Sequence, residues 1–537
     1  MALLTEYNMA RSSSCTITTD WKSFMSIYMG IDASTQGVKA VLIDAKAGDI
    51  IFTESINFGS DLPEYKSPNG FIEGNEPLVK HANPLMWIDG LELLMERLQK
   101  KGAPLSRVLA LSGSGQQHGS VYLKSSFPDV LRKLSPEKKI AGQISGTLSR
   151  KTSPIWMDSS TGRECDEIKS AIGKRLQNDT GSPATERFTG PQIRKFWKNE
   201  KERYDETAAI HLVSSFLASL LCGENSPVDF GDGAGMNLLN LKTLKWDSEI
   251  VEATAPGLLR KLPPPVASCV RAGNLSPYFS KYGFKAGIPV TVWSGDNPNS
   301  LIGTGAAEAG IAVVSLGTSD TFFAAMPEAA VDPDGYGHVF GNPAGGFMSL
   351  ICFKNGSLAR ENVRAEYGLE WKDVEDILKN KSIPGNGGNM MLPYFTSEIT
   401  PLVLKPGPRF KGKEIEKSHP EAGVKIRAVM EGQALSMRLH SQWIGGGFSA
   451  LRVTGGASRS NEFCRILANV FQARIEKISS ADSAALGAAM RAANAEGGYS
   501  WKKLSAAFSV AVERINPDCS AKDIYDRMLS DFTAFEK

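Results

Sequence analysis

The sequence predicts an α/β protein built as two lobes that face each other. Its 537 residues are too many for one hydrophobic core, because cores stop growing near roughly 250–300 residues. Strand-like segments alternate with helix-like segments through short glycine-rich junctions, which is typical of α/β architecture. Both halves also begin with a hairpin whose turn is small and rich in hydroxyl groups. This weak internal repeat predicts lobes of related topology, although a chance match of two hairpins would give the same pattern.

The composition is that of an ordinary globular protein. Hydrophobic residues make up 42% and charged residues 22%, which excludes wholesale disorder. The 60 Lys and Arg against 58 Asp and Glu leave a net charge of +2, so nothing favours a nucleic-acid or membrane-surface partner. Seven widely spaced Cys without a CxxC pair predict reduced thiols in a cytoplasmic protein. We expect small-molecule partners, no nucleic acid, no membrane, and a monomer or a homodimer.

Three parts of the chain are expected. Residues 1–25 lack an apolar segment of signal-peptide length and predict a disordered or dispensable extension, with an address label as the alternative. The N-terminal lobe is expected over 26–303 and the C-terminal lobe, with a helical tail, over 304–537. The most apolar stretch, Ile210–Cys222, is shorter than the roughly 20 residues of a membrane span and predicts a buried helix.

The elements of the first lobe follow from hydrophobic periodicity. A strand, a small-residue turn and two further strands come first. A long amphipathic helix follows and ends near Lys100–Gly102. The next strand runs directly into a glycine-rich loop, so polar groups should lie at its end. The apolar helix face consists of Trp87, Leu91, Leu94 and Leu98, and the strands are Ile27–Asp32, Val38–Ile43, Ile50–Thr53, Val108–Leu111 and Pro289–Trp293.

The second lobe is expected to open in the same way. Strand Ile311–Leu316 leads through a tight polar turn to a returning strand, Thr321–Ala325. A later strand, Leu451–Val453, leads into a helix over Asn461–Val470 with one apolar face. The segment from Trp501 onward is expected to be helical.

The two hairpin turns are candidate phosphate sites. Successive small residues can aim backbone N–H groups and hydroxyls at one point, and such a concavity binds phosphate. Asp32, at the end of its strand, could hold a hydrated Mg²⁺ ion. The alternative is a local Asx-turn with an exposed Lys39. Two such turns facing each other could hold the polyphosphate of ATP; the candidates are Asp32, Ser34, Thr35, Gln36 and Lys39 in the first, and Gly317, Thr318 and Ser319 in the second.

A pair of glycines opens the predicted helix of the second lobe. Gly455 and Gly456 follow a strand and would let a flat ring or a ribose approach the backbone, while the helix N-terminus attracts an anion. The pattern is neither a GxGxxG fingerprint nor a P-loop, so neither mechanism applies. A plain strand-to-helix turn is the alternative.

Polar residues at other strand ends are candidates for sugar chemistry. Asp296, flanked by Gly295 and Asn297, is placed to accept a proton from a hydroxyl, although Asp is also common in turns for local reasons. Gln117 and His118 suit a polyol, with a structural His118 as the alternative. The six His are scattered, without HExxH, and no GxSxG is present. These absences favour chemistry by positioning and electrostatics, as in phosphoryl transfer.

Taken in order, the motifs resemble those of the FGGY family of carbohydrate kinases. The blocks are MGIDASTQGVKA, SGSGQQHGS, WMDSS, ERFTG, SGDNPNSL, SLGTSDT, CFKNGSLARE and VTGGAS, and they span residues 28–490. The resemblance implies two actin-like, ribonuclease H-type lobes with ATP and Mg²⁺ in the cleft between them. It also implies phosphorylation of D-xylulose to D-xylulose 5-phosphate, in xylose metabolism. The alternatives are another polyol (ribulose, glycerol or a heptulose) or a non-kinase ATPase of the same fold.

The resemblance also assigns roles by motif. Asp296 would be the catalytic base, and Asp32 would bind the metal through water on the nucleotide side. Two departures from the family pattern lie where contacts to the nucleotide base are expected: Ser460 stands where many members have Asn, and Arg465 where many have Gln. The implied sugar contacts are Gln117, His118, Arg187, Asp296 and Asn297, and the implied nucleotide contacts of the second lobe include Trp371 near adenine, Gly455, Gly456 and Ser460. From the residues alone, Arg187 could instead pair with Glu186, and Trp371 would by default pack.

Overall fold

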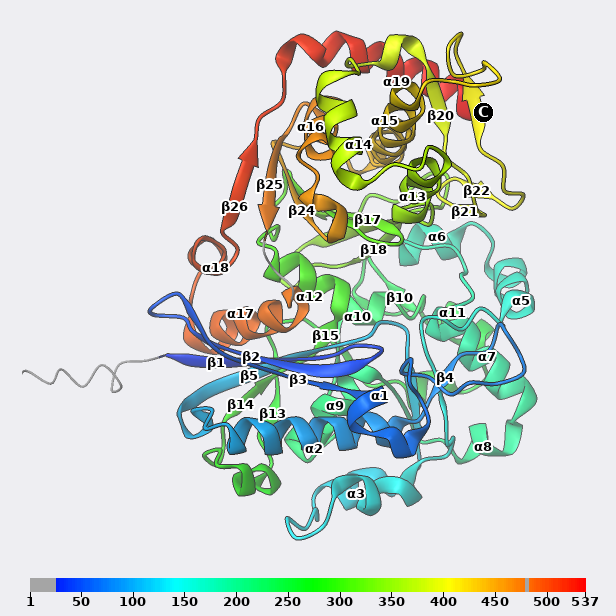
Figure 1. Ribbon diagram of the computed structural model, residues 1–537. Helices are drawn as coiled ribbons and strands as arrows, with labels where there is room; N and C mark the ends of the chain where they lie inside the picture. Colours follow the sequence, from blue (N-terminus) through cyan, green and yellow to red (C-terminus); the bar gives the residue numbers. More distant parts are fainter. Residues whose placement is uncertain (1–25, 479–481) are drawn as a thin grey trace, which may run out of the picture.

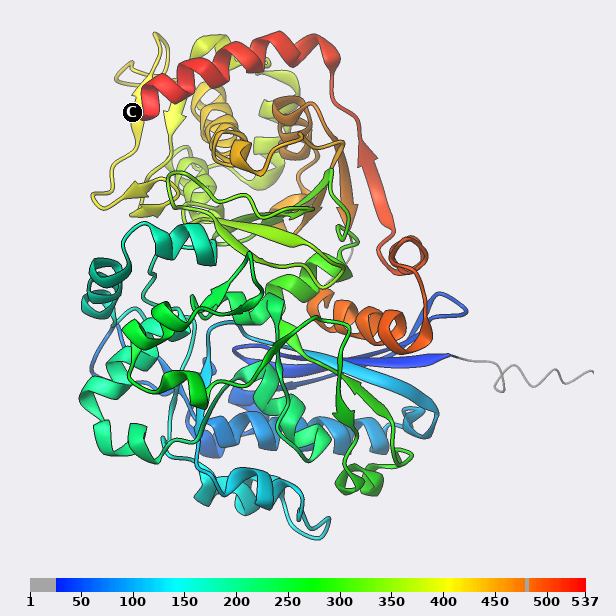
Figure 2. The same cartoon turned by 180° about the vertical axis from the view of Figure 1, so that it is seen from behind.

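The structure is a computed structural model that describes residues 26–478 and 482–537. The predicted extension, residues 1–25, lies outside the described residues. Two seven-stranded sheets form the centres of two lobes, stacked one above the other in Figures 1 and 2. The predicted α/β fold of two lobes is therefore confirmed.

The two sheets repeat one topology. In each lobe the first strand pairs antiparallel with the second and parallel with a later strand that follows a helix. The shared order shows that the two predicted hairpins belong to a genuine structural repeat. The first sheet runs β13 (Arg271–Asn274), β14 (Pro289–Thr291), β5 (Val108–Gly115), β1 (Ile27–Ala33), β2 (Gly37–Asp44) and β3 (Asp49–Asn57), with β15 (Ser294–Gly295) also on β5; the second runs β18 (His338–Gly341), β19 (Phe347–Phe353), β17 (Asp320–Met326), β16 (Ile311–Leu316), β24 (Ala450–Thr454), β25 (Arg474–Ile478) and β26 (Ala511–Ile515).

Helices from distant parts of the chain cover the first sheet. The predicted amphipathic helix is α2 (Pro84–Lys100), and its apolar face is fully buried. On the opposite face lies α17 (Ser483–Gly497), far away in sequence, and it also packs against α12 (Asp296–Gly303) (Figure 1). Glycines allow this close approach, because a Cβ at Gly487 would lie 1.9 Å from the Asn299 carbonyl oxygen. Residues near the C-terminus thus support the element that begins with Asp296.

Two predicted helical stretches contain strands. Residues 210–212, expected in a helix, belong to β8 (Ala209–Leu212), which pairs with β6 (Ser120–Leu123); the helix α9 starts at the next residue (Val213–Cys222). The tail from Trp501 onward has two helices, α18 (Trp501–Phe508) and α19 (Lys522–Glu536), but β26 lies between them. Here pairing with β25 outweighs local helical propensity.

One set of helices covers one face of the second sheet. Other helices pack together around a small separate core in the first lobe. Among the described residues, no helix is both long and apolar enough to cross a membrane. The second-lobe helices are α13 (Ser357–Glu366), α14 (Trp371–Asn380), α15 (Ala422–His440), α16 (Asn461–Phe471) and α19. The remaining first-lobe helices are α1 (Phe58–Asp61), α3 (Phe127–Leu131), α4 (Ile140–Ile144), α5 (Gly162–Ile172), α6 (Arg175–Thr180), α7 (Thr189–Asn199), α8 (Lys201–Glu206), α10 (Phe230–Ala234) and α11 (Ser248–Thr254).

Short strand pairs complete the fold. They lie outside the two main sheets and fasten the connecting loops to one another. The pairs are β4 (His81–Ala82) with β7 (Ser153–Pro154), β9 (Val228–Asp229) with β12 (Pro265–Val266), β10 (Leu239–Asn240) with β11 (Lys245–Trp246), β20 (Met390–Leu392) with β23 (Arg409–Lys411), and β21 (Glu398–Ile399) with β22 (Leu402–Val403).

Candidate active site

Parallel strand pairing brings Asp32 and the Asp296 segment to one edge of the first sheet. β1 and β5 are aligned with Asp32 beside Ser114, and β15 is aligned with Ser294 on the other side of Ser114. Neighbouring strands lie about 4.8 Å apart, so the backbones of Asp32 and Ser294 are separated by roughly 10 Å. Asp296 follows two residues later, as the first residue of α12. The two acids predicted to share a site therefore lie at the same edge.

Asp296 has the electrostatic properties of a base that works near neutral pH. Burial and the charge of Asp32 raise the pKa of Asp296 to about 7, and the backbone N–H groups of Asn297 and Gln117 lower it only in part. The Asn297 N–H donates to Asp296 Oδ1 at 2.9 Å, which fixes the carboxylate at the start of the helix. A carboxylate with a pKa near 7 can accept a proton at neutral pH.

Asp32 is a buried carboxyl with an unused oxygen. Burial raises the pKa of Asp32 to about 6, which the hydroxyl of Ser114 and the charge of Lys39 oppose only in part. Asp32 Oδ1 is buried and accepts no hydrogen bond from the described residues. Lys39 Nζ lies 3.0 Å from Asp482 Oδ1, just before α17, so this amine already has a protein partner.

The first hairpin turn is held by its own residues and by one distant indole. The N–H and the hydroxyl of Ser34 both donate to the Gly37 carbonyl oxygen, at 2.9 and 3.1 Å. Thr35 Oγ1 accepts a hydrogen bond from Trp156 Nε1 at 2.8 Å. Gln36 is exposed. The turn is thus preformed, and the Thr35 hydroxyl keeps its proton free for another acceptor.

The predicted sugar residues Gln117 and Asn297 adjoin Asp296, and His118 follows Gln117 directly in the chain. Asn297 Nδ2 donates to Gln117 Oε1 at 2.8 Å and to Asp296 Oδ1 at 3.2 Å, so the Asn297 amide joins Gln117 to the carboxylate. His118 Nδ1 lies 2.8 Å from the Gly235 carbonyl oxygen, which can only accept, so Nδ1 carries the proton and Nε2 is the acceptor nitrogen. Its backbone has φ +68°, a strained value typical of functional sites.

Arg187 reaches the same region from the segment before α7. Its guanidinium carbon lies 5.8 Å from the centroid of the Phe188 ring. Burial and the charge of Arg187 lower the pKa of His118 to about 3. The His118 ring stacks on Phe188 at 4.3 Å between ring centroids. Among the described residues no carboxylate forms an ion pair with Arg187, contrary to the alternative of pairing with Glu186; its side-chain partner is His338.

Unsatisfied polar atoms concentrate at this edge of the sheet. Buried side-chain N and O atoms are usually hydrogen-bonded, so a cluster of such atoms without partners indicates a binding site for a ligand or water. These atoms, each buried and without a hydrogen bond among the described residues, are Asp32 Oδ1, both amide atoms of Gln116, Gln117 Nε2, Asp232 Oδ1 and Ser294 Oγ.

A cavity in the second lobe gathers most of the nucleotide residues predicted in that lobe, and none of those predicted in the first. It has a volume of about 630 Å³, within the range of small-ligand sites. Gly455 lies behind it with φ +90°, and a Cβ there would come within 2.4 Å of the Leu316 carbonyl oxygen, so only glycine fits. Ser460 caps α16 by accepting from the Phe463 N–H at 3.0 Å, and its hydroxyl contacts Glu375. The predicted residues that line the cavity are Gly317, Thr318, Trp371, Gly456 and Ser460.

Not every predicted nucleotide residue meets this cavity. Ser319 is exposed at the tip of the second hairpin and is not among the lining residues. Asp32 and Asp296 do not line it either, so the cavity and the strand-end acids are two separate groups. Arg465, at the second departure from the family pattern, is exposed and pairs with Glu462 at 3.4 Å.

Two residues at the site escaped the sequence reasoning. Asp232, in α10, is fully buried, and burial together with the charges of Asp229 and Asp296 raises its pKa well above the usual value. His338, in β18 of the second sheet, contacts Arg187. The glycine-rich run around Asp232 was the only available signal, because His338 becomes a neighbour only through the fold. No group of three or more His, Cys, Asp or Glu in the described ranges could hold a metal ion by itself.

Solved structures share this arrangement of lobes. A xyloylose kinase from Brucella ovis superposes with a TM-score of 0.79 at 24% identity, covering 95% of this chain and 98% of that one. A xylulose kinase from Rhodospirillum rubrum gives a TM-score of 0.80 at 20% identity with the same coverage. The fold is therefore that of two-lobed sugar kinases, in agreement with the strand-end acids and the ligand-sized cavity.

Sequence relatives identify the family within this class. The N-terminal domain model of the FGGY family of carbohydrate kinases matches residues 151–303, and the C-terminal domain model matches residues 312–496. Xylulose kinase from Mus musculus is 38% identical over 95% of this chain and 94% of its own length. Xylulose kinase 2 from Arabidopsis thaliana is 39% identical over 87% of each chain. The chain belongs to the FGGY family of carbohydrate kinases, whose members use ATP as phosphoryl donor.

Proposed function

We propose that the protein transfers the γ-phosphoryl group of ATP to a primary hydroxyl of D-xylulose, giving D-xylulose 5-phosphate. The observation that carries the proposal is Asp296, a partly buried carboxyl with a pKa near 7 at the same sheet edge as the unsatisfied, buried carboxyl oxygen of Asp32. The relatives named xylulose kinase, at 38–39% identity, support this sugar rather than another polyol.

In the proposed mechanism Asp296 orients the hydroxyl and takes its proton as the oxygen attacks the γ-phosphorus. The bond between the γ-phosphorus and the β–γ bridging oxygen breaks, and ADP leaves. The transition state of phosphoryl transfer has little covalent chemistry for the protein to perform, so positioning and charge stabilisation carry most of the rate. Because Asp296 is held by the Asn297 N–H, it need not reorganise when the hydroxyl arrives.

The polar residues around Asp296 would bind the other oxygens of the sugar. His118 Nε2 can accept from a sugar hydroxyl, while Gln117 Nε2 has two N–H donors without a partner. Arg187, whose guanidinium lies over the Phe188 ring on which His118 also stacks, would supply further donors. Asn297, whose amide bonds Gln117, would complete the set.

The second-lobe cavity would hold the nucleotide. Trp371 offers an aromatic face for adenine, and Gly456, with open space at its Cβ position, would let the base or ribose approach the backbone. Gly317, Thr318 and Ser319 would contact phosphates at the edge of this cavity. From the first lobe, the proposed phosphate contacts are Ser34, Thr35, Gln36 and Lys39. In the second lobe, Ser460 lines the cavity and Gly455 supports it through its contact with the Leu316 backbone.

The residues present fit a hydrated Mg²⁺ ion at Asp32. Mg²⁺ prefers carboxylate oxygens and usually keeps several waters, so one carboxylate with a free oxygen is a suitable anchor. When bound with ATP, the ion would offset negative charge on the phosphates. Asp32 would hold the hydrated ion on the phosphate side of Asp296.

Closure of the lobes would bring the nucleotide cavity and the strand-end acids together. We place the boundary between the two lobes between residues 303 and 304, so that they cover 26–303 and 304–537. Helix α17 then belongs to the second lobe in sequence but packs on the sheet of the first. An open cleft would let water compete with the sugar for the phosphoryl group. We also propose a cytoplasmic protein, since the six cysteines of the described part are free thiols. We further propose a monomer or a homodimer.

A coupled ADP-release assay over a panel of sugars tests the proposal. D-xylulose should stimulate ADP release most strongly. Stronger stimulation by ribulose, glycerol or a heptulose would select another member of the family, and ADP release that no sugar changes would contradict a sugar kinase acting on any of them.

A further inference from the structure

The edge strand of the second sheet lies against the segment of the first lobe that carries Arg187. The Val339 N–H, in β18, donates to the Gly181 carbonyl oxygen at 3.1 Å. Gln177 Nε2, in α6, donates to the Asp332 carbonyl oxygen at 2.6 Å. Figure 1 shows α6 directly beside the second sheet. These two bonds attach the chain to the first lobe before and after His338, the residue of β18 that contacts Arg187.

His338 makes a directional hydrogen bond to Arg187. Arg187 Nη2 lies 3.1 Å from His338 Nε2, and His338 Nδ1 lies 3.2 Å from Ser182 Oγ. A guanidinium nitrogen can only donate, so Nε2 is the acceptor and the proton resides on Nδ1, which donates to Ser182. The ring is therefore fixed in one tautomer between a donor and an acceptor.

The surroundings of His338 keep it neutral and immobile. It is 5% exposed, and its ring lies 5.1 Å from that of Phe188 and 6.2 Å from that of Phe340. Burial and the charge of Arg187 hold the pKa of His338 well below its usual value. A neutral ring is required here, because an imidazolium has no lone pair with which to accept from the guanidinium.

We propose that His338 is a positioning residue that orients the Arg187 guanidinium toward the sugar, so that the second lobe completes a site otherwise built by the first. The proposal rests on the proposed function, in which Arg187 binds the sugar. Arg187 has five N–H donors and no carboxylate partner among the described residues. One donor is committed to His338, and that bond selects the direction in which the others point. Sugar binding and the position of β18 are then linked.

A pair of matched variants distinguishes orientation from packing. His338→Gln places an acceptor oxygen close to the position of Nε2, whereas His338→Asn places it close to that of Nδ1 and leaves Arg187 without an acceptor. We expect His338→Asn to raise the KM for D-xylulose about 10- to 100-fold, the range for loss of a hydrogen bond to a charged group. His338→Gln should stay within about threefold of the parent protein. The KM for ATP should not change in either variant.

A double-mutant cycle supplies the decisive comparison. In an Arg187→Met background the His338→Asn substitution should have no further effect on the KM for D-xylulose, because the group that it orients is gone. An equal effect in both backgrounds, an unchanged sugar KM in His338→Asn, or a His338→Gln variant as impaired as His338→Asn would each overturn the proposal. Thermal unfolding of every variant separates these outcomes from misfolding.

The test remains informative if D-xylulose is the wrong sugar. The same variants are then assayed with whichever polyol stimulates ADP release, and sugar binding is measured by calorimetry with an unreactive ATP analogue. If no sugar binds or reacts, the proposed function fails. If a sugar reacts and the His338 variants behave alike, only the role of His338 fails.

Discussion

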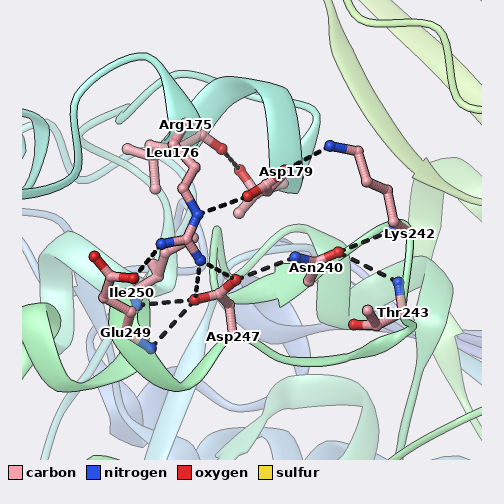
Figure 3. A network of polar contacts seen from close by, with 10 residues as sticks. Arg175, Leu176, Asp179, Asn240, Lys242, Thr243, Asp247, Glu249 and Ile250 are labelled. Carbon is pink, nitrogen blue, oxygen red and sulfur yellow. Dashed lines mark hydrogen bonds and ion pairs between the residues drawn. The ribbon is translucent and has the colours of Figure 1, made fainter.

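Two groups of carboxylates in the first lobe have opposite environments. Around Arg175 (Figure 3), the guanidinium lies 2.8 Å from both Asp179 and Asp247 and also contacts Glu249. At the sheet edge, the like charges of Asp32 and Asp296 repel each other, and no arginine or lysine in the described part of the chain forms an ion pair with either carboxylate. The carboxylates around Arg175 are thus bonded to cations and amides, whereas the described carboxylates at the sheet edge have no cation bonded to them.

The pKa directions follow this difference. Hydrogen bonding to Lys242 lowers the pKa of Asp179, and the Asn240 amide, the Ile250 N–H and Arg175 together outweigh burial in lowering the pKa of Asp247. Burial and like charge raise the pKa of Asp296 to about 7. Paired acids therefore stabilise the folded chain in the ionised form, whereas the acids at the sheet edge oppose folding when they ionise.

The number of acids in a region therefore says little about its function. What distinguishes the sheet edge is buried carboxyl oxygens without partners, such as those of Asp32 and Asp232. Such an arrangement persists only where a ligand or a proton is the missing partner.

The largest expected effect is on catalysis by Asp296→Asn. The substitution keeps the shape of the side chain but removes the proton acceptor, so kcat should fall by about 10²–10⁴, the usual contribution of general acid–base catalysis. Binding of ATP, measured by calorimetry, should stay nearly unchanged. A variant with the kcat of the parent protein would remove Asp296 from the role of base.

The next effect concerns the cavity of the second lobe. Trp371 is 44% exposed and lines the cavity, so Trp371→Ala should raise the KM for ATP about tenfold, since stacking of a base on an aromatic ring contributes ~1–3 kcal/mol. The KM for the sugar should not change. Ile383→Ala, at an exposed apolar side chain that does not line the cavity, is the control. Equal ATP affinities in both variants would place the base elsewhere.

The Arg175 network should affect stability without affecting catalysis. Asp247→Ala removes bonds to Arg175 and Asn240 and the cap of α11, so the free energy of unfolding should fall by about 1–3 kcal/mol. Kinetic constants should stay at the parent values. A loss of activity at unchanged stability would show that this network is not purely structural.

The smallest expected effect is that the Asp296→Asn variant is more stable than the parent protein at high pH. The pKa of Asp296 is raised from 3.8 to about 7, so the folded state binds more protons than the unfolded state between these values. Stability therefore falls as the pH rises through this interval, and the ionised carboxylate destabilises the fold above pH 7. Asp296→Asn should melt a few degrees above the parent protein at pH 8 and at the same temperature near pH 4. A lower melting temperature at pH 8 would contradict the raised pKa.

Local sequence patterns sufficed to predict the acids at the strand ends, because their positions depend only on where each strand ends and in which direction it runs. Asp32 and Asp296 each follow a strand, and the carboxyl ends of parallel strands meet at one edge. The two glycine-bearing motifs of the second lobe also meet, since Gly455 packs on the Leu316 backbone at the end of β16. In these cases periodicity and strand direction sufficed.

Side-chain partners from distant segments were not predictable in this way. The contact of Thr35 with Trp156 and the pairing of Lys39 with Asp482 depend on how loops and α17 pack on the first sheet. His338 reaches Arg187 across 151 residues of sequence. The segment of β26 was predicted to be helical, because local propensity does not reveal the hydrogen bonds that its partner β25 supplies.

A crystal structure of the chain with D-xylulose, Mg²⁺ and an unreactive ATP analogue tests the central claim most directly. A carboxylate oxygen of Asp296 should lie within about 2.6–3.2 Å of the primary hydroxyl. That hydroxyl should face the γ-phosphorus in line, with Asp32 on the metal side. A bound sugar whose primary hydroxyl lies far from Asp296, or a γ-phosphate that does not approach the edge formed by Asp32 and Asp296, would contradict it.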